Sequence, residues 1–122
     1  MNTKPHPLLA ALLATALATP SMHVQADVIP DWNLKTGDLI TEAKIGTPPA
    51  VRIAAIVQTA ALQAIDTLPR GALVEAAIAA AHRTVLGKLM PAQQASIDVA
   101  YQAALSVLAD GPAKATGIAV GE

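Results

Sequence analysis

The stretch ALVEAAIAAAHRTVLGKLM, residues 72–90, predicts an α-helix and with it an all-α fold. Its larger apolar residues recur at helical spacing, and its charged residues fall away from that stripe. Alanine fills most of the remainder, and alanine has no side-chain entropy to lose on entering a helix. The predicted apolar stripe consists of Val74, Ile78, Val85 and Leu89.

The composition extends this prediction to the rest of the chain. There is one Trp, one Tyr and no Phe, whereas strands favour aromatic and β-branched side chains. We therefore predict four to five antiparallel helices in an incomplete helical bundle, preceded by a signal-peptide helix. Antiparallel packing is expected because the connections are short.

Turn signals and apolar periodicity place the other helices. Thr47 is the expected N-cap of the second one, with Pro48 and Pro49 in its first turn. That helix is apolar on nearly every face, so we expect it to be buried on most sides. The first helix is expected to be interrupted near Gly37. The predicted ranges are residues 31–45, 50–65, 91–109 and 112 onward.

The start of the chain is typical of a secretory signal peptide. Lys4 supplies the positive charge, and residues 8–18 form an apolar run that is short for a bilayer span of about 20 residues. Pro20 ends that run, and small residues at Val24 and Ala26 predict cleavage before Asp27.

We accordingly divide the chain into a signal peptide, residues 1–26, and an N-terminal helical segment, residues 27–122. The expected location is periplasmic or secreted. Two alternatives stay open: cleavage after Ala18, and a segment that remains attached as a membrane anchor.

The charge pattern excludes some classes of partner and site. The formal net charge is −1 and no run of like charges occurs, so we expect no nucleic-acid partner. The absence of cysteine excludes disulfides and thiolate metal sites.

His82 is the one histidine of the predicted mature chain. Glu75 lies two turns earlier on the same helix, and a Glu–His pair is able to do acid–base work. Two turns, however, separate the residues by about 10 Å along the axis. We expect His82 to be a helix-surface or interface histidine that is hydrogen-bonded to a neighbour.

The remaining polar residues have ordinary structural interpretations. Trp32 and Tyr101 are expected to be packing residues. Four cations are scattered across the predicted elements and are expected on solvated faces rather than in one anion site: Arg52, Arg70, Arg83 and Lys88. Three carboxylates are too few for a metal site and are expected to form an exposed acidic face: Asp31, Asp38 and Glu42.

Several short stretches in residues 27–122 together resemble the N-terminal helical region of bacterial vanadium-dependent haloperoxidase-like proteins, of the type-2 phosphatidic acid phosphatase superfamily. The order and spacing of these stretches carry the resemblance. They are Asp31-Trp32-Asn33, Pro48-Pro49 with Arg52, the run from Ala79 to Leu86, Pro91-Ala92-Gln93-Gln94, Tyr101, Asp110-Gly111-Pro112-Ala113-Lys114, and the run from Gly117 to Glu122. Gln58 and Gln63 depart from the family, where a His and an Asp are expected.

The resemblance implies an all-α fold and either vanadate-assisted halide oxidation by peroxide or phosphate-ester hydrolysis. It places the catalytic residues, including a Pro-Ser-Gly-His motif, downstream of the matched part. The similar string Pro20-Ser21-Met22-His23 has Met22 in place of the glycine and lies in the predicted signal peptide. We therefore predict no catalytic, cofactor-binding or metal-binding residue and no cofactor in this chain. The resemblance implies vanadate as the cofactor of intact haloperoxidases of this family.

Three functional hypotheses follow. The first is a truncated N-terminal fragment of an exported haloperoxidase-like protein, inactive alone, whose partner is the missing C-terminal catalytic part. The second is an independent small periplasmic helical protein that binds a partner or self-associates. The third is a small enzyme that uses Glu75 and His82. Membrane contact is expected only through an uncleaved signal segment.

Overall fold

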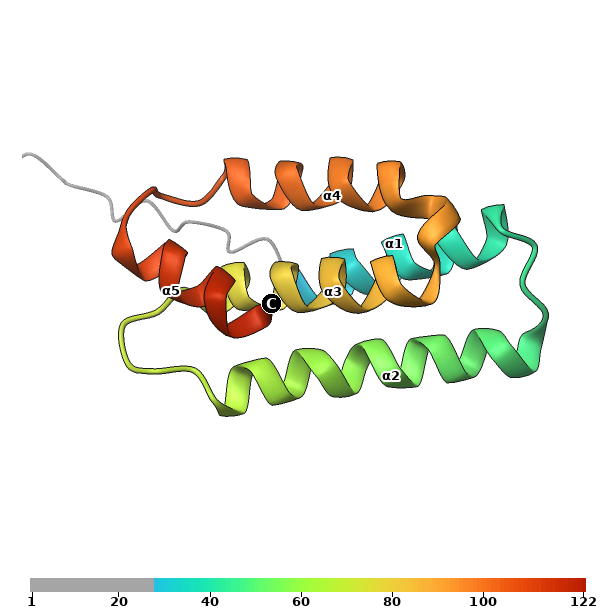
Figure 1. Cartoon of the computed structure of the whole chain (residues 1–122), viewed down its shortest axis with the longest axis horizontal. Coiled ribbons are helices and arrows are strands. Elements are labelled where there is room, and N and C mark those ends of the chain that lie inside the picture. The colour runs from blue at the N-terminus through green and yellow to red at the C-terminus, as the bar shows by residue number, and fades with distance from the viewer. Residues whose placement is uncertain (1–27) are drawn as a thin grey trace, which may run out of the picture.

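A computed structural model describes residues 28–122, which form five α-helices and one short 3-10 helix (Figure 1). No strand occurs in these residues, so the all-α prediction is confirmed for them. The predicted signal peptide and its cleavage site before Asp27 lie outside the described residues. The elements are α1 (Val28–Glu42), α2 (Thr47–Asp66), α3 (Val74–Leu89), η1 (Pro91–Gln93), α4 (Gln94–Ser106) and α5 (Pro112–Gly121).

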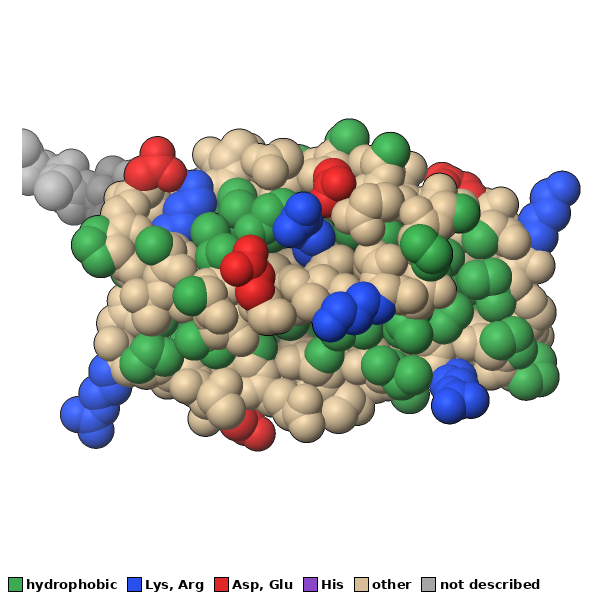
Figure 2. Space-filling model, viewed as in Figure 1, with side chains coloured by type: hydrophobic (Ala, Val, Ile, Leu, Met, Phe, Trp, Pro, Cys, Tyr) green, Lys and Arg blue, Asp and Glu red, His purple; other side chains and the backbone are tan. Residues whose placement is uncertain are grey.

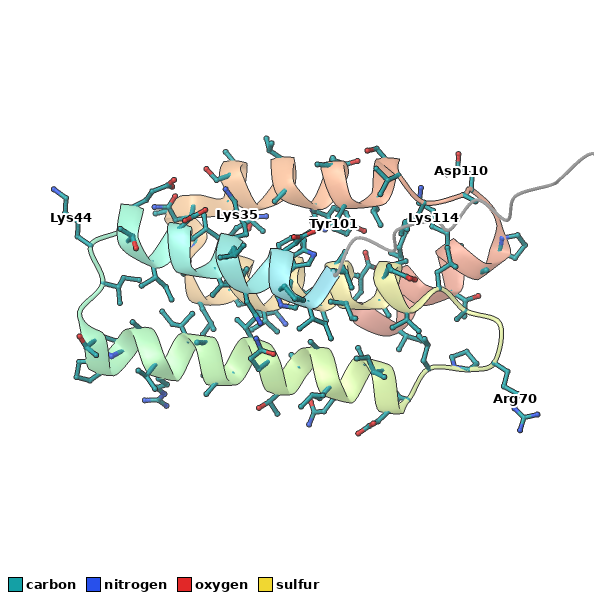
Figure 3. The ribbon with its side chains drawn as sticks, turned by 180° about the vertical axis from the view of Figure 1, so that it is seen from behind. Lys35, Lys44, Arg70, Tyr101, Asp110 and Lys114 are labelled. Atoms are coloured by element: carbon teal, nitrogen blue, oxygen red, sulfur yellow. The ribbon has the colours of Figure 1, made fainter. Side chains whose placement is uncertain are left out.

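Helix α3 is the central element. Figure 1 shows it between α2 and α4, with α5 in front, and α1 lies on the opposite side in the reverse view of Figure 3. Every side chain from Ala76 to His82 is buried, so this part of α3 has no solvent face. The predicted single stripe is wrong at its ends, since Val74 and Leu89 are 40% and 37% exposed. Alanine is small enough for neighbouring helices to surround α3.

Helix α2 is peripheral, which corrects the expectation that it would be buried on most sides. It buries only Val57, Ala61 and Ala64, whereas Val51 and Leu62 are 63% and 58% exposed. Apolar content predicts that a helix will bury surface but does not fix which helix lies in the centre. Here the alanine-rich α3 takes that place, because small side chains allow close approach from several directions.

The ends of the helices differ from the predicted ends by a few residues. Thr47 is not an N-cap: Gly46 is the extended residue before α2, and no side chain caps the helix. The prediction of proline in the first turn is confirmed. Helix α1 runs through Gly37 without a break and ends at Glu42, after which Lys44 takes a positive φ of 53°.

The segment after Pro91 also differs from the single helix expected over residues 91–109. It begins as the 3-10 turn η1 and continues as α4, which ends at Ser106. Pro91 lacks the backbone N–H of an ordinary helical residue, so a tight turn at this position costs little. The face of α4 that packs on the core consists of Ile97, Tyr101 and Leu105, which are all buried.

Helices α5 and α3 are in close backbone contact. A Cβ atom on Gly117 would overlap the backbone oxygen of Leu73, and one on Gly121 would lie 2.6 Å from the Cβ of Ala80. The backbone N–H of Leu73 also donates to the carbonyl of Ala113, at 3.0 Å. Glycine on α5 and alanine on α3 thus let the two helices meet with little side-chain volume between them.

Candidate functional site

His82 of α3 is, with Thr36 of α1, one of two buried polar side chains among residues 28–122. Its side chain is fully buried against α1, so of the two positions expected for it the helix surface is wrong and the interface is confirmed. The ring stacks on Trp32 of α1, with ring centroids 5.0 Å apart and planes 24° apart. Trp32 is itself 3% exposed, which confirms its prediction as a packing residue.

The hydrogen bonding of His82 fixes its tautomer. Nδ1–H donates to the carbonyl of Ile78 at 2.8 Å, and a carbonyl is only an acceptor, so Nδ1 carries the proton. The expected hydrogen bond to a neighbour is therefore confirmed. Nε2 is buried without a hydrogen-bond partner among the described residues, and in the neutral ring it holds only a lone pair.

Burial lowers the pKa of His82 below the ordinary histidine value of 6.5, and the hydrogen bond to Ile78 partly opposes that shift. Burial has this effect because removal from water disfavours the charged imidazolium. Glu75 is not among the causes of the shift. A buried, neutral imidazole does not reach solvent-borne substrate in this conformation, so the geometry does not favour the Glu75–His82 enzyme.

A second polar cluster lies beside His82, where α3 meets α4. Arg83 Nε donates to Asp98 Oδ1 at 2.8 Å, and Gln94 Nε2 donates to the same oxygen at 2.9 Å. The Arg83 guanidinium also lies over the ring of Tyr101, 5.0 Å from its centroid, a cation–π arrangement. The bond from Arg83 lowers the pKa of Asp98. The cluster fastens α4 to α3.

Sequence analysis missed the Arg83–Asp98 pair, although a signal for it exists. The two residues stand at equal distances in sequence from the bond between Met90 and Pro91. In a helical hairpin that turns at this bond, residues at equal distances lie opposite each other. Tyr101 is 6% exposed, so its prediction as a packing residue is confirmed.

The other cations do not converge with Arg83. Figure 3 shows Arg70 pointing away from the protein at one end and Lys44 at the other, while Lys114 lies beside Asp110. Lys114 Nζ is 2.8 Å from Asp110 Oδ1, an ion pair between α5 and the loop that precedes it. Arg52 and Lys88 are exposed. The expectation of scattered cations on solvated faces is thus confirmed for Arg52, Arg70 and Lys88.

The carboxylates of α1 are exposed at Asp31, Asp38 and Glu42, as predicted. Within residues 28–122 no three His, Cys, Asp or Glu side chains lie close enough to hold a metal ion together. None of the helices in this range has both the length and the apolarity of a membrane span.

Gln58, one of the two departures from the haloperoxidase-like pattern, has a structural contact. Its Nε2 donates to Asn33 Oδ1 and so joins α2 to α1 near the molecular surface. The other departure, Gln63, is exposed on α2.

Comparison of the chain with models of known families, with curated protein sequences and with solved structures gave no match. The resemblance to haloperoxidase-like proteins therefore stays a prediction.

Proposed function

We propose that residues 28–122 form a non-catalytic helical module of an exported haloperoxidase-like protein. In this proposal the five helices are the first part of a larger antiparallel bundle, and any vanadate or phosphate chemistry belongs to another part of that protein. The proposal rests on the sequence resemblance and on the use of the polar residues, since the His82 and Arg83 clusters both join one helix to another.

The observation that carries the proposal is the apolar surface left on α2. Val51 and Leu62 are 63% and 58% exposed and lie on the same side of the helix at α-helical periodicity. Figure 2 shows apolar side chains interspersed with separate charges over one face of the molecule, including the region of α2. Further helices that packed on α2 would bury this surface.

Two measurements test the proposal. The purified chain should show no vanadate-dependent halide oxidation and no phosphatase turnover above a heat-treated control, and turnover would contradict it. The DNA downstream of the codon for Glu122 should encode a Pro-Ser-Gly-His motif, in the same frame or a shifted one. Downstream DNA without such a motif in any frame would contradict the proposed relationship.

The same apolar surface favours a second candidate, an independent periplasmic helical protein that self-associates or binds a partner. A large contiguous apolar patch on a protein surface commonly marks an interaction site. Sedimentation equilibrium should then show oligomers that Leu62→Lys converts to monomers, while Thr59→Lys, at an exposed polar position on α2, leaves them intact. A wild-type monomer at all concentrations would exclude self-association.

The proposed location, periplasmic or secreted, is tested separately. The mass of the protein recovered from the periplasm or medium should correspond to a chain that begins at Asp27. A full-length chain in the membrane fraction would favour the uncleaved anchor instead.

A further inference from the structure

The contact between Trp32 of α1 and His82 of α3 depends on the charge of the imidazole. In the neutral ring, Nδ1–H donates to Ile78, and the lone pair of the buried Nε2 has no partner in the described part of the chain. Protonation takes a proton from solvent and forms an N–H bond at Nε2. That N–H lies in the imidazole plane, and the indole is stacked on the face of the ring, so Trp32 offers the new donor no acceptor.

We propose that Trp32 and His82 form an acid-sensitive latch, in which protonation of Nε2 releases α1 from α3. We call the state in which Trp32 is stacked on His82 closed and the state in which α1 has left α3 open. In the open state, water solvates the imidazolium, and the face of α3 against which Trp32 packs is exposed. The stacked indole attracts a cation, but a buried donor and charge without a partner cost more than an exposed imidazolium.

Helix α1 is the element that such a proton would displace. It packs less extensively on α3 than α2, α4 and α5 do. Its buried residues are only Trp32, Thr36 and Leu39. The Thr36 hydroxyl donates to the Trp32 carbonyl within α1, at 2.7 Å, and so does not tie α1 to α3.

Among residues 28–122, no charged side chain makes a contribution to the pKa of His82 that would stabilise an imidazolium there. Every Asp, Glu, Lys and Arg in residues 28–122 is at least partly exposed, and the shift in the pKa of His82 has no contribution from any of them. The buried Tyr101 has a pKa raised above its ordinary value of 10.0 and is neutral. The charged groups on the elements around His82 include Asp31 and Lys35 on α1, Arg52 and Asp66 on α2, Glu75 and Arg83 on α3, Asp98 on α4, and Lys114 and Glu122 on α5.

The direction of the pH dependence follows from the lowered pKa in the closed state. His82 in the open state takes up a proton near the ordinary histidine value of 6.5, whereas the closed state resists protonation. The closed state is therefore most stable relative to the open state above that pH, and this stability decreases as the pH falls. The equilibrium constant for closing should fall roughly tenfold per pH unit below the ordinary value, until the closed state also binds the proton.

Trp32 is the single tryptophan of the chain, so its fluorescence reports on the latch. We would record the emission of the full chain, with His6 and His23 replaced by Gln, from about pH 7.5 to about pH 4.5. The expected result is a red shift and loss of intensity that begin below the ordinary histidine pKa. Emission that stays constant while His82 titrates would overturn the proposal.

His82→Phe is the matched control, because it keeps an aromatic ring against Trp32 and cannot take up a proton. The emission of this variant should stay constant over the pH range in which the wild type opens. If the variant instead shows the same transition as the wild type, the transition belongs to carboxylates and the proposal is overturned. Should this variant not fold, ¹⁵N-NMR titration of the wild-type imidazole gives an independent result. The latch requires protonated Nδ1 at neutral pH and a pKa below 6.5, and a pKa at or above that value would overturn it.

Discussion

Asp98 accepts hydrogen bonds from two side chains, one on α3 and one on its own helix α4. One of its carboxylate oxygens accepts from Arg83 of α3 and from Gln94 one turn earlier on α4. The side chains of Arg83 and Asp98 are 39% and 41% exposed, so water and salt screen their charges. Such a pair orients α4 on α3 more than it strengthens the fold.

We predict that Asp98→Asn lowers the Tm slightly at neutral pH and has no effect at strongly acid pH. Arg83 holds the pKa of Asp98 below its ordinary value. The contribution of the pair is therefore complete above the ordinary aspartate pKa and is lost as the pH falls through the lowered one. Thermal unfolding at both pH values measures this, with Asp110→Asn as the control, since the Asp110–Lys114 pair links α5 only to the loop that precedes it. A difference in Tm that is the same at both pH values would contradict the prediction.

Predictability from the sequence varies from residue to residue. The packing roles of Trp32 and Tyr101 follow from their size and apolarity. The burial of His82 does not follow from the sequence. A histidine beside an arginine on an alanine-rich helix occurs both on surfaces and in cores, so the local sequence does not distinguish the two positions. The stacking of His82 on Trp32 depends on how α1 crosses α3, and no local pattern encodes that crossing.

At the scale of the elements, the closest contact is between α5 and α3. Gly117 and Gly121 face Ala76, Ala77, Ala80 and Ala81 at distances that leave no room for another carbon atom. A thin core of small side chains gains little from burial per residue. The dispersion contacts between α3 and α5 consequently depend on a short distance between the backbones of these two helices.

We predict that Gly121→Ala destabilises the protein by roughly 1–3 kcal/mol, the usual cost of overpacking, because α5 must move away from α3. Gly37→Ala is the matched control, since a Cβ there meets nothing within 4 Å and Gly37 lies inside α1. That variant should be more stable by roughly 0.5–1 kcal/mol, because alanine restricts the unfolded chain. Denaturant unfolding measures both changes, and a destabilisation at Gly37 equal to that at Gly121 would refute the close contact.

Periodicity predicted that helices exist but not which one lies in the centre. The mean apolarity of α2 suggested burial, yet Val51 and Leu62 are exposed. The order of the helices around α3 is set by where small side chains are concentrated, and in α3 they occupy nearly every position from Ala76 to Ala81. A pattern scored by hydrophobicity alone does not distinguish a small apolar residue from a large one.

At the scale of the whole molecule, α3 couples the other helices, since α1, α2, α4 and α5 all pack on it. The main cluster of buried residues draws on all of these helices except α5, and the partly buried Ile118 of α5 packs against it. Solvent therefore reaches the amides of α3 only when most of this cluster has come apart. Helix α1, by contrast, packs less extensively on α3 than the other helices do, so we expect it to open while those helices stay together.

We predict that native-state hydrogen exchange separates two levels of protection. Amides from Ala76 to His82 should exchange with the free energy of global unfolding and with its full dependence on denaturant. Amides around Trp32 and Thr36 should exchange through a smaller opening whose free energy depends less on denaturant. Their protection should decrease first when the pH is lowered through the range in which His82 takes up a proton. Equal protection of α1 and α3 at every pH would mean that the five helices unfold as one unit, and α1 would then have no separate open state.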